Sequence, residues 1–125
     1  MKVLLLNGSP RKGNTHTAVE LIAQGIKENL KAEVEVIEVA KYKVAGCVAC
    51  DYCVTNVGKC VNQKDDGQLL ADKIAEADVV VFASPIYWWG ISAQIKLVLD
   101  RIYMKKFERE KKYKQVGIIA IGADG

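Results

Sequence analysis

The segment that most constrains the fold lies at the start of the chain, where an apolar run meets a loop rich in hydrogen-bond donors. Four consecutive apolar residues, Val3 to Leu6, are typical of a strand buried on both faces of a parallel sheet. The loop NGSPRKGNTHT follows, and its Gly8, Pro10 and Gly13 interrupt regular structure before a helical pattern starts at Ala18. Such a turn directs backbone N–H groups and the positive end of the helix dipole toward one point. The segment therefore predicts an anion site suited to a phosphate.

The rest of the chain alternates between strand and helix patterns. Strands are predicted at residues 33–39, 79–83 and 116–121, and helices at 18–30, 65–77 and 91–102. This alternation predicts one α/β domain over residues 1–125, a three-layer sandwich with a doubly wound parallel sheet. The strand at 33–39 alternates acidic and β-branched residues, which indicates a sheet edge.

Three loops each follow a predicted buried strand, at residues 9–17, 84–90 and 122–125. Ligands of such sheets bind beyond the carboxyl ends of the strands, so we expect these loops to lie side by side. The second loop adds Tyr87, Trp88 and Trp89, although one tryptophan could instead pack in the core or in an interface. A phosphate site beside flat aromatic groups predicts a flavin mononucleotide. Neither GxxxxGK[ST] nor GxGxxG is present in the first loop.

Four cysteines, Cys47, Cys50, Cys53 and Cys60, have the spacing C-x2-C-x2-C-x6-C within the segment 41–64, which has no helical or strand period. Zinc sites usually pair two separated C-x2-C hooks, whereas closely spaced C-x2-C steps are similar to cubane cluster ligation. The spacing favours a [4Fe-4S] cluster. Metal-free thiols, including a redox disulfide, and a zinc site are the alternatives.

The motifs LLLNGSPRKGNT and ASPIYWWGISAQIKLVLDR resemble the flavodoxin-like NAD(P)H-dependent FMN reductase family, and the cysteines resemble its iron-sulfur flavoprotein branch. The resemblance implies a flavodoxin-like strand order 2-1-3-4. It implies an FMN site made of Ser9, Arg11, Asn14, Thr15, Thr17, Pro85, Ile86, Tyr87, Trp88, Gly90, Gly122, Ala123 and Asp124. Family members continue into another helix and a fifth strand, whereas this sequence stops at Gly125. The chain would then be a fragment, a natural short form, or a chain that takes the missing structure from a neighbour, and of these we expect truncation, with the fifth strand missing.

The resemblance implies an FMN-dependent oxidoreductase in which a [4Fe-4S] cluster on the four cysteines exchanges electrons with FMN. A small redox protein such as a ferredoxin, or NAD(P)H, would be the partner, and the chain would form a homodimer or homotetramer. Such a carrier requires no catalytic acid or base. A cluster-free NAD(P)H-dependent FMN or quinone reductase is one alternative, and a zinc-stabilised binding domain without redox activity is another.

Composition limits the other classes of function. The formal net charge is only +3, which does not favour nucleic-acid binding. The first apolar run stops at Asn7, and no run reaches transmembrane length, so we expect a cytoplasmic protein that does not enter a membrane.

Overall fold

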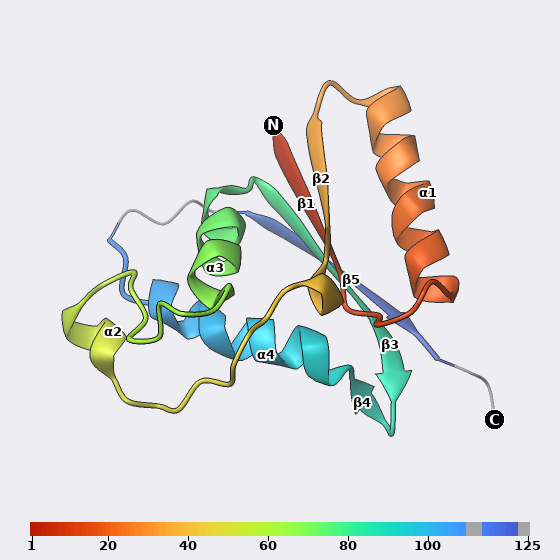
Figure 1. Cartoon of the computed structure of the whole chain (residues 1–125). Helices are drawn as coiled ribbons and strands as arrows, with labels where there is room; N and C mark the ends of the chain where they lie inside the picture. The colour runs from red at the N-terminus through yellow and green to blue at the C-terminus, as the bar shows by residue number, and fades with distance from the viewer. Residues whose placement is uncertain (110–113, 123–125) are drawn as a thin grey trace.

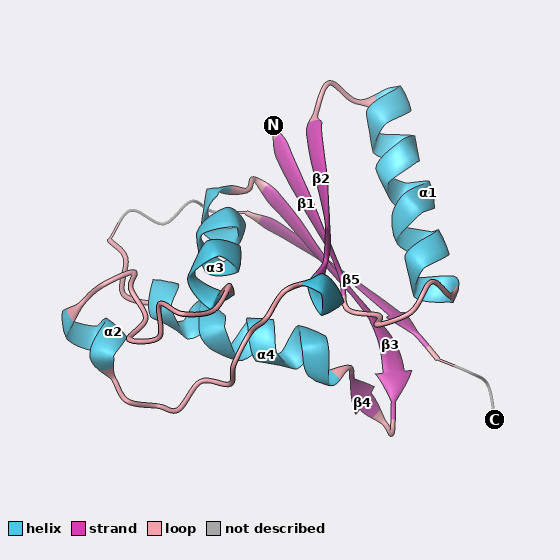
Figure 2. Cartoon of the chain, in the orientation of Figure 1, coloured by secondary structure: helices cyan, strands magenta, loops and turns pink. Residues whose placement is uncertain are grey.

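The computed structural model describes residues 1–109 and 114–122, and it contains a parallel sheet with helices on both faces (Figures 1 and 2). The parallel strands run in the order β2-β1-β3-β5, which confirms the predicted order 2-1-3-4. Their bounds are β1 Lys2–Asn7, β2 Glu33–Glu38, β3 Val79–Tyr87 and β5 Gln115–Ile121. A short strand, β4 (Gly90–Ile91), pairs with the end of β3 in antiparallel fashion.

Helix α1 (Asn14–Asn29) covers one face of the sheet, and α3 (Gly67–Glu76) and α4 (Ala93–Arg101) cover the other (Figure 1). Two apolar clusters follow from this arrangement. Val3 and Leu5 pack with the α1 residues, whereas Leu4 and Leu6 pack with α3 and α4. Because side chains alternate between the faces of a strand and both faces of β1 are covered, every position from Val3 to Leu6 is apolar.

The predicted second loop is mostly strand, which corrects its expected start at Ser84. Ser84 and Pro85 continue the parallel ladder of β3, opposite Ala120 and Ile121. A two-residue turn at Trp88 and Trp89 then joins β3 to β4. The serine-proline pair indicated a loop, but pairing with β5 extends the strand through it.

Two helix starts also differ from the sequence prediction. Helix α1 begins at Asn14 rather than at Ala18, and its N-cap is Gly13. Helix α4 begins at Ala93, and the hydroxyl of its N-cap Ser92 accepts a hydrogen bond from the Ile95 N–H at 3.3 Å. The side-chain cap at α4 is of the usual serine type. The cap of α1 has no side-chain acceptor.

The cysteine-rich segment connects β2 to α3 and contains two short elements, the 3₁₀ helix η1 (Val39–Lys41) and helix α2 (Tyr52–Thr55). From the end of β2 the segment runs beside α4 to the C-terminal end of that helix (Figure 1). There it meets the 3₁₀ helix η2 (Ile102–Lys105). In the described part of the chain, no helix has the length and apolar character needed to cross a membrane.

Candidate functional site

The loops that follow β1 and β3 are tied together at the carboxyl edge of the sheet. The Gly8 N–H donates to the Ala83 carbonyl oxygen at 2.8 Å, and the fully buried Ser92 hydroxyl donates to the Gly8 carbonyl oxygen at 2.6 Å. The Ser92 N–H donates to Ser84 Oγ at 2.9 Å. Ser84 and Ser92 were not among the predicted site residues. The position of Ser92 just before a helical pattern was the available signal.

Gly8 allows the first loop to approach helix α4 closely. A Cβ atom at this position would lie 2.9 Å from Ile95 Cβ and 3.0 Å from both the Ala83 carbonyl oxygen and Ser92 Oγ. No larger residue fits there without moving the strand or the helix. The absence of a side chain at Gly8 therefore sets the path of the loop that leads to α1.

The start of α1 has the electrostatic character of an anion site. Gly13 provides no side-chain cap, and the first turn of α1 contains no acidic residue. The Arg11 guanidinium folds over Gly13, because a Cβ atom added there would lie 2.7 Å from Arg11 Nη1. Positive charge and the unpaired N–H groups of a helix start thus occupy the same place.

The other predicted residues of the first loop lie around this helix start. The Ser9 N–H donates to Asn7 Oδ1 at 3.0 Å, and its hydroxyl donates to the Arg11 carbonyl oxygen at 2.9 Å. Thr17 Oγ1 donates to the Gly13 carbonyl oxygen at 3.2 Å. Thr15 is buried beneath the loop, whereas Asn14 is exposed.

The hairpin between β3 and β4 presents an exposed aromatic surface beside this loop. Trp88 and Trp89 are 94% and 91% exposed, and both have positive φ, 44° and 66°. Two-residue hairpin turns of this kind normally use Asn-Gly, so the tryptophans occupy a conformation that disfavours them. Pro85 is buried, whereas Ile86, Tyr87 and the two tryptophans are exposed.

The third loop begins next to the second. A Cβ atom at Gly122 would lie 3.5 Å from Ile86 Cγ1, so the end of β5 is beside the end of β3. Ala123 and Asp124 lie outside the described residues. The structure therefore brings the starts of all three predicted loops to one edge of the sheet.

The four cysteines line a second site, a cavity of about 140 Å³ at the far end of α4. All four thiols are free; Cys47 and Cys50 are exposed, and Cys53 and Cys60 are half-buried. Burial raises the pKa of the Cys53 thiol, and the three neighbouring thiols act in the same direction. Within residues 1–109 and 114–122, no group of three or more His, Cys, Asp or Glu side chains is arranged around a single metal ion. The four cysteines therefore share one cavity without a preformed site for a single metal ion among the described residues.

Helix α4 separates the two sites. Ser92, at its start, contacts the loop edge, whereas Arg101, at its end, lines the cavity of the cysteines. Nine helical residues with a rise of 1.5 Å each correspond to about 13 Å. Within one chain, the cysteines and the loop edge are therefore on opposite ends of this helix.

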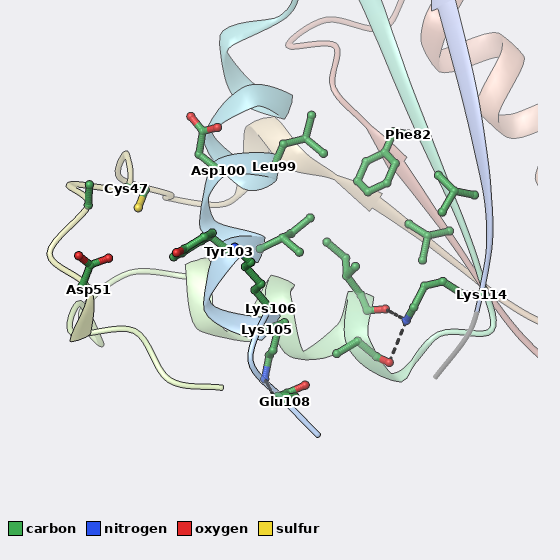
Figure 3. Close-up of a pocket in the computed structure, with 16 residues that line it drawn as sticks. Cys47, Asp51, Phe82, Leu99, Asp100, Tyr103, Lys105, Lys106, Glu108 and Lys114 are labelled. Atoms are coloured by element: carbon green, nitrogen blue, oxygen red, sulfur yellow. Dashed lines mark hydrogen bonds and ion pairs between the residues drawn. The ribbon is translucent and has the colours of Figure 1, made fainter. Parts of the chain in front are cut away.

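A hollow of about 900 Å³ borders the cysteine site (Figure 3). It lies between η2 and the face of β3 and β5, where Phe82, Leu99 and Val116 contribute apolar surface. Lys105, Lys106 and Lys114 lie along its edge, and Cys47 is at its border with the cysteine segment. Among the described residues, none from the three predicted loops lines this hollow.

Comparison with known proteins identifies the family of this chain. The family model for NADPH-dependent FMN reductase matches residues 1–125. An iron-sulfur flavoprotein of Archaeoglobus fulgidus is 38% identical over 106 residues, which cover 85% of this chain and 51% of the relative. One of Methanocaldococcus jannaschii is 34% identical over 126 residues, covering 99% of this chain and 63% of the relative. The chain thus spans between half and two thirds of the length of these relatives.

Among solved structures, the NAD(P)H:quinone oxidoreductase from Methanothermobacter marburgensis has a TM-score of 0.78 at 16% sequence identity. The match covers all of this chain and 65% of that structure, and it supports the flavodoxin-like fold. The fold, the order of its strands and the match over the whole sequence lead to one assignment: this chain belongs to the NADPH-dependent FMN reductase family.

Proposed function

We propose that this chain binds FMN at the loop edge and a [4Fe-4S] cluster at the four cysteines, and that it works as an electron-transferring oxidoreductase. The observation that carries the FMN part is the start of α1, where Gly13 provides no cap and Arg11 lies over the free helix end. Family membership and the names of the relatives support the same cofactors.

The loop edge fits a flavin mononucleotide. Ser9, Arg11, Asn14, Thr15 and Thr17 would hold its phosphate through backbone N–H groups, hydroxyls and one positive charge. The β3–β4 hairpin would flank the flat ring. Its contacts would come from Pro85, Ile86, Tyr87, Trp88 and Gly90, with Gly122, Ala123 and Asp124 on the other side.

The cysteine spacing favours a cluster over zinc. Zinc sites usually pair two separated C-x2-C hooks, whereas here four closely spaced cysteines contribute to the lining of one cavity. When bound, the cluster would supply single-electron transfer and FMN would supply one- or two-electron chemistry. The protein's part is to hold the thiols, to orient the flavin and to limit the access of water.

The exposure of Cys47 and Cys50 supports access by a small redox protein such as a ferredoxin. The opposite placement of the two sites along α4 supports a homodimer or homotetramer in which the cysteines of one chain approach the loop edge of another. Mass measurement of the FMN-loaded chain in solution tests this assembly. A monomer under those conditions would contradict it.

The second candidate is a cluster-free NAD(P)H-dependent FMN or quinone reductase, which the description of the family favours. In that protein a nicotinamide would stack against the flavin beside the exposed hairpin, and the cysteines would remain thiols. NAD(P)H oxidation by a preparation that contains FMN but no iron would support this candidate.

Anaerobic reconstitution of the 125-residue chain with FMN, iron and sulfide separates the candidates. We expect about one FMN, four iron and four sulfide per chain, measured by flavin fluorescence and by iron and sulfide analysis. Flavin without stoichiometric iron would favour the reductase. Tight zinc binding without affinity for flavin would favour a non-redox domain.

Two variants test whether the sites are separate. Cys53→Ser should abolish the cluster and leave FMN binding unchanged, whereas Arg11→Ala should weaken FMN binding by about tenfold and leave the cluster in place. If Cys53→Ser also lost the flavin, the two sites would not be independent.

A further inference from the structure

Arg101 is a buried cation that connects the two ends of the cysteine-rich segment. Only 3% of its surface is exposed. Its Nη1 donates to the Ala45 carbonyl oxygen at 3.0 Å, and its Nη2 donates to the Asn62 carbonyl oxygen at 3.2 Å. Ala45 precedes Cys47 by two residues, and Asn62 follows Cys60 by two residues. One guanidinium therefore closes the loop that carries all four thiols.

Asp65 completes this connection. Its two carboxylate oxygens accept from Arg101 Nη1 at 2.6 Å and from Nη2 at 3.1 Å, in a fork that only arginine can form. The same carboxylate accepts from the Ala45 N–H at 2.8 Å and the Gly67 N–H at 2.9 Å. The buried charge is thus neutralised and hydrogen-bonded, as its burial requires.

Gly67 leaves room for the guanidinium. A Cβ atom at this position would lie 2.4 Å from Arg101 Cζ and 2.5 Å from Nη2. Glycine at the first position of α3 therefore lets the plane of the guanidinium lie against the backbone of that helix. The position of Arg101 is fixed from three sides, by the segment ends, by Asp65 and by α3.

Arg101 also lines the cavity of the thiols, together with Cys60. In the part of the chain that the structure describes, its buried Nε is without a hydrogen-bond partner. Burial lowers the pKa of Arg101, but Asp65 and the Cys60 side chain outweigh it and raise that pKa. One N–H of this buried cation is thus free to donate, in a residue that lines the cavity together with Cys60.

We propose that Arg101 is the positioning residue of the cysteine site: its Nη atoms fix the ends of the thiol loop, and its charge and Nε–H act on sulfur near Cys60. The first part holds for the protein without metal. The second part rests on the proposed function, since it concerns the potential of a bound cluster, which depends on net charge and on hydrogen bonds to sulfur.

The first experiment uses the metal-free chain. Hydrogen exchange of residues 43–66 and the rate of thiol alkylation are compared between wild type, Arg101→Gln and Arg101→Lys. We expect both variants to lose protection in this segment and to be alkylated at least fivefold faster at Cys60, because neither side chain can form the fork. Lys96→Gln is the matched control, since Lys96 pairs with Asp100 on the exposed surface of the same helix. Wild-type protection in both Arg101 variants would overturn the proposal.

The second experiment measures the reduction potential of the reconstituted cluster and separates positioning from a purely structural role. Arg101→Gln removes a positive charge beside Cys60 and should lower the potential. Asp65→Asn removes a negative charge and should raise it, although both variants break the same fork. We expect about a tenfold change in the ratio of reduced to oxidised cluster in each direction, or 59 mV for one electron.

Arg101→Lys should keep most of the wild-type potential, because it keeps the charge. Shifts of the same sign in Arg101→Gln and Asp65→Asn would show that these residues act only on loop structure, and would overturn the electrostatic part. Failure of wild type to bind any cluster would refute the proposed function and the electrostatic part, whereas the result on the metal-free chain would still decide the role of Arg101 in positioning the segment.

Discussion

The ion pair between Asp65 and Arg101 should make the stability of this protein sensitive to acid. Burial raises the pKa of Asp65, but hydrogen bonds from the Arg101 guanidinium and from the N–H groups of Ala45 and Gly67 outweigh it, and the pKa falls from 3.8 to about 2. The folded chain therefore stabilises the charged form of the Asp65 carboxyl group relative to the unfolded chain. Its contribution is fully present above pH 3.8 and is lost as the pH falls through 2.

The pKa difference sets the size of the effect. The gap between 3.8 and about 2 corresponds to about 2 kcal/mol at 1.36 kcal/mol for each pKa unit. About 1 kcal/mol of this is lost between pH 5 and pH 3, and most of the rest by pH 2. The Asp65 side chain is only 11% exposed, so screening by solvent reduces this value little.

Urea unfolding between pH 5 and pH 3 measures the loss of stability, and a carbon-13 titration of the Asp65 carboxyl group measures its pKa directly. We expect Asp65→Asn to be less stable at neutral pH and to lose about 1 kcal/mol less than wild type on going to pH 3. Asp72→Asn is the comparison. The pKa of Asp72 is also lowered by Lys105 and Gln68 despite its partial burial, but this carboxylate is more exposed, so its effect should be smaller. A parallel loss of stability in wild type and Asp65→Asn, or a carboxyl pKa near 4, would refute this reasoning.

Two further substitutions test the loop edge. Gly8→Ala places a Cβ atom within 3.0 Å of Ile95, Ala83 and Ser92, so it should lower the free energy of unfolding by about 1–3 kcal/mol and weaken FMN binding; unchanged unfolding in urea would contradict this contact. Replacing the Trp88-Trp89 pair by Asn-Gly should raise the free energy of unfolding by about 1 kcal/mol, because both positions have positive φ, and should weaken FMN binding, measured by fluorescence titration; wild-type affinity would remove Trp88 from the site.

The apolar runs predicted the sheet because a short, continuous apolar run is typical of a strand that is covered on both faces. Runs such as Val3 to Leu6 predicted the buried strands and the edge at which the loops lie, whereas the strand order was implied by the resemblance to the FMN reductase family. The end of β3 could not be predicted in the same way. Local turn signals at Pro85 and Gly90 indicated a loop, whereas the observed ladder depends on a partner strand about 35 residues away.

The ion pair of Arg101 and Asp65, which connects the ends of the cysteine segment, was not predicted, for a related reason. Arg101 and Asp65 are 36 residues apart, and no local rule pairs them. A signal was nevertheless present, because Arg101 follows Ile95 and Val98 at steps of three residues on the buried side of α4. A charged residue in an apolar stripe requires a buried partner, and the Asp65-Asp66-Gly67 turn before α3 offered one.

Backbone strain is concentrated in the two segments for which we propose cofactors. Among the described residues, the non-glycine positions with positive φ are Ala49 and Asp51 in the cysteine segment and Trp88 and Trp89 in the hairpin. Each such position lowers the free energy of unfolding by on the order of 1 kcal/mol, and neighbouring residues in the sequence do not compensate for this loss. Contacts from outside supply the compensation, from Arg101 for the cysteine segment and from the buried serines at the base of the hairpin.

This separation between strained segments and stabilising framework has a functional consequence. The framework residues are buried and hydrogen-bonded in the chain alone, so they hold the ends of the cysteine segment and the base of the hairpin before any ligand arrives. A ligand that binds such a preformed segment loses little free energy to ordering it. In these two segments the residue types do not suit the backbone conformation that the fold imposes on them. Such a mismatch is expected where residues are selected for binding rather than for stability.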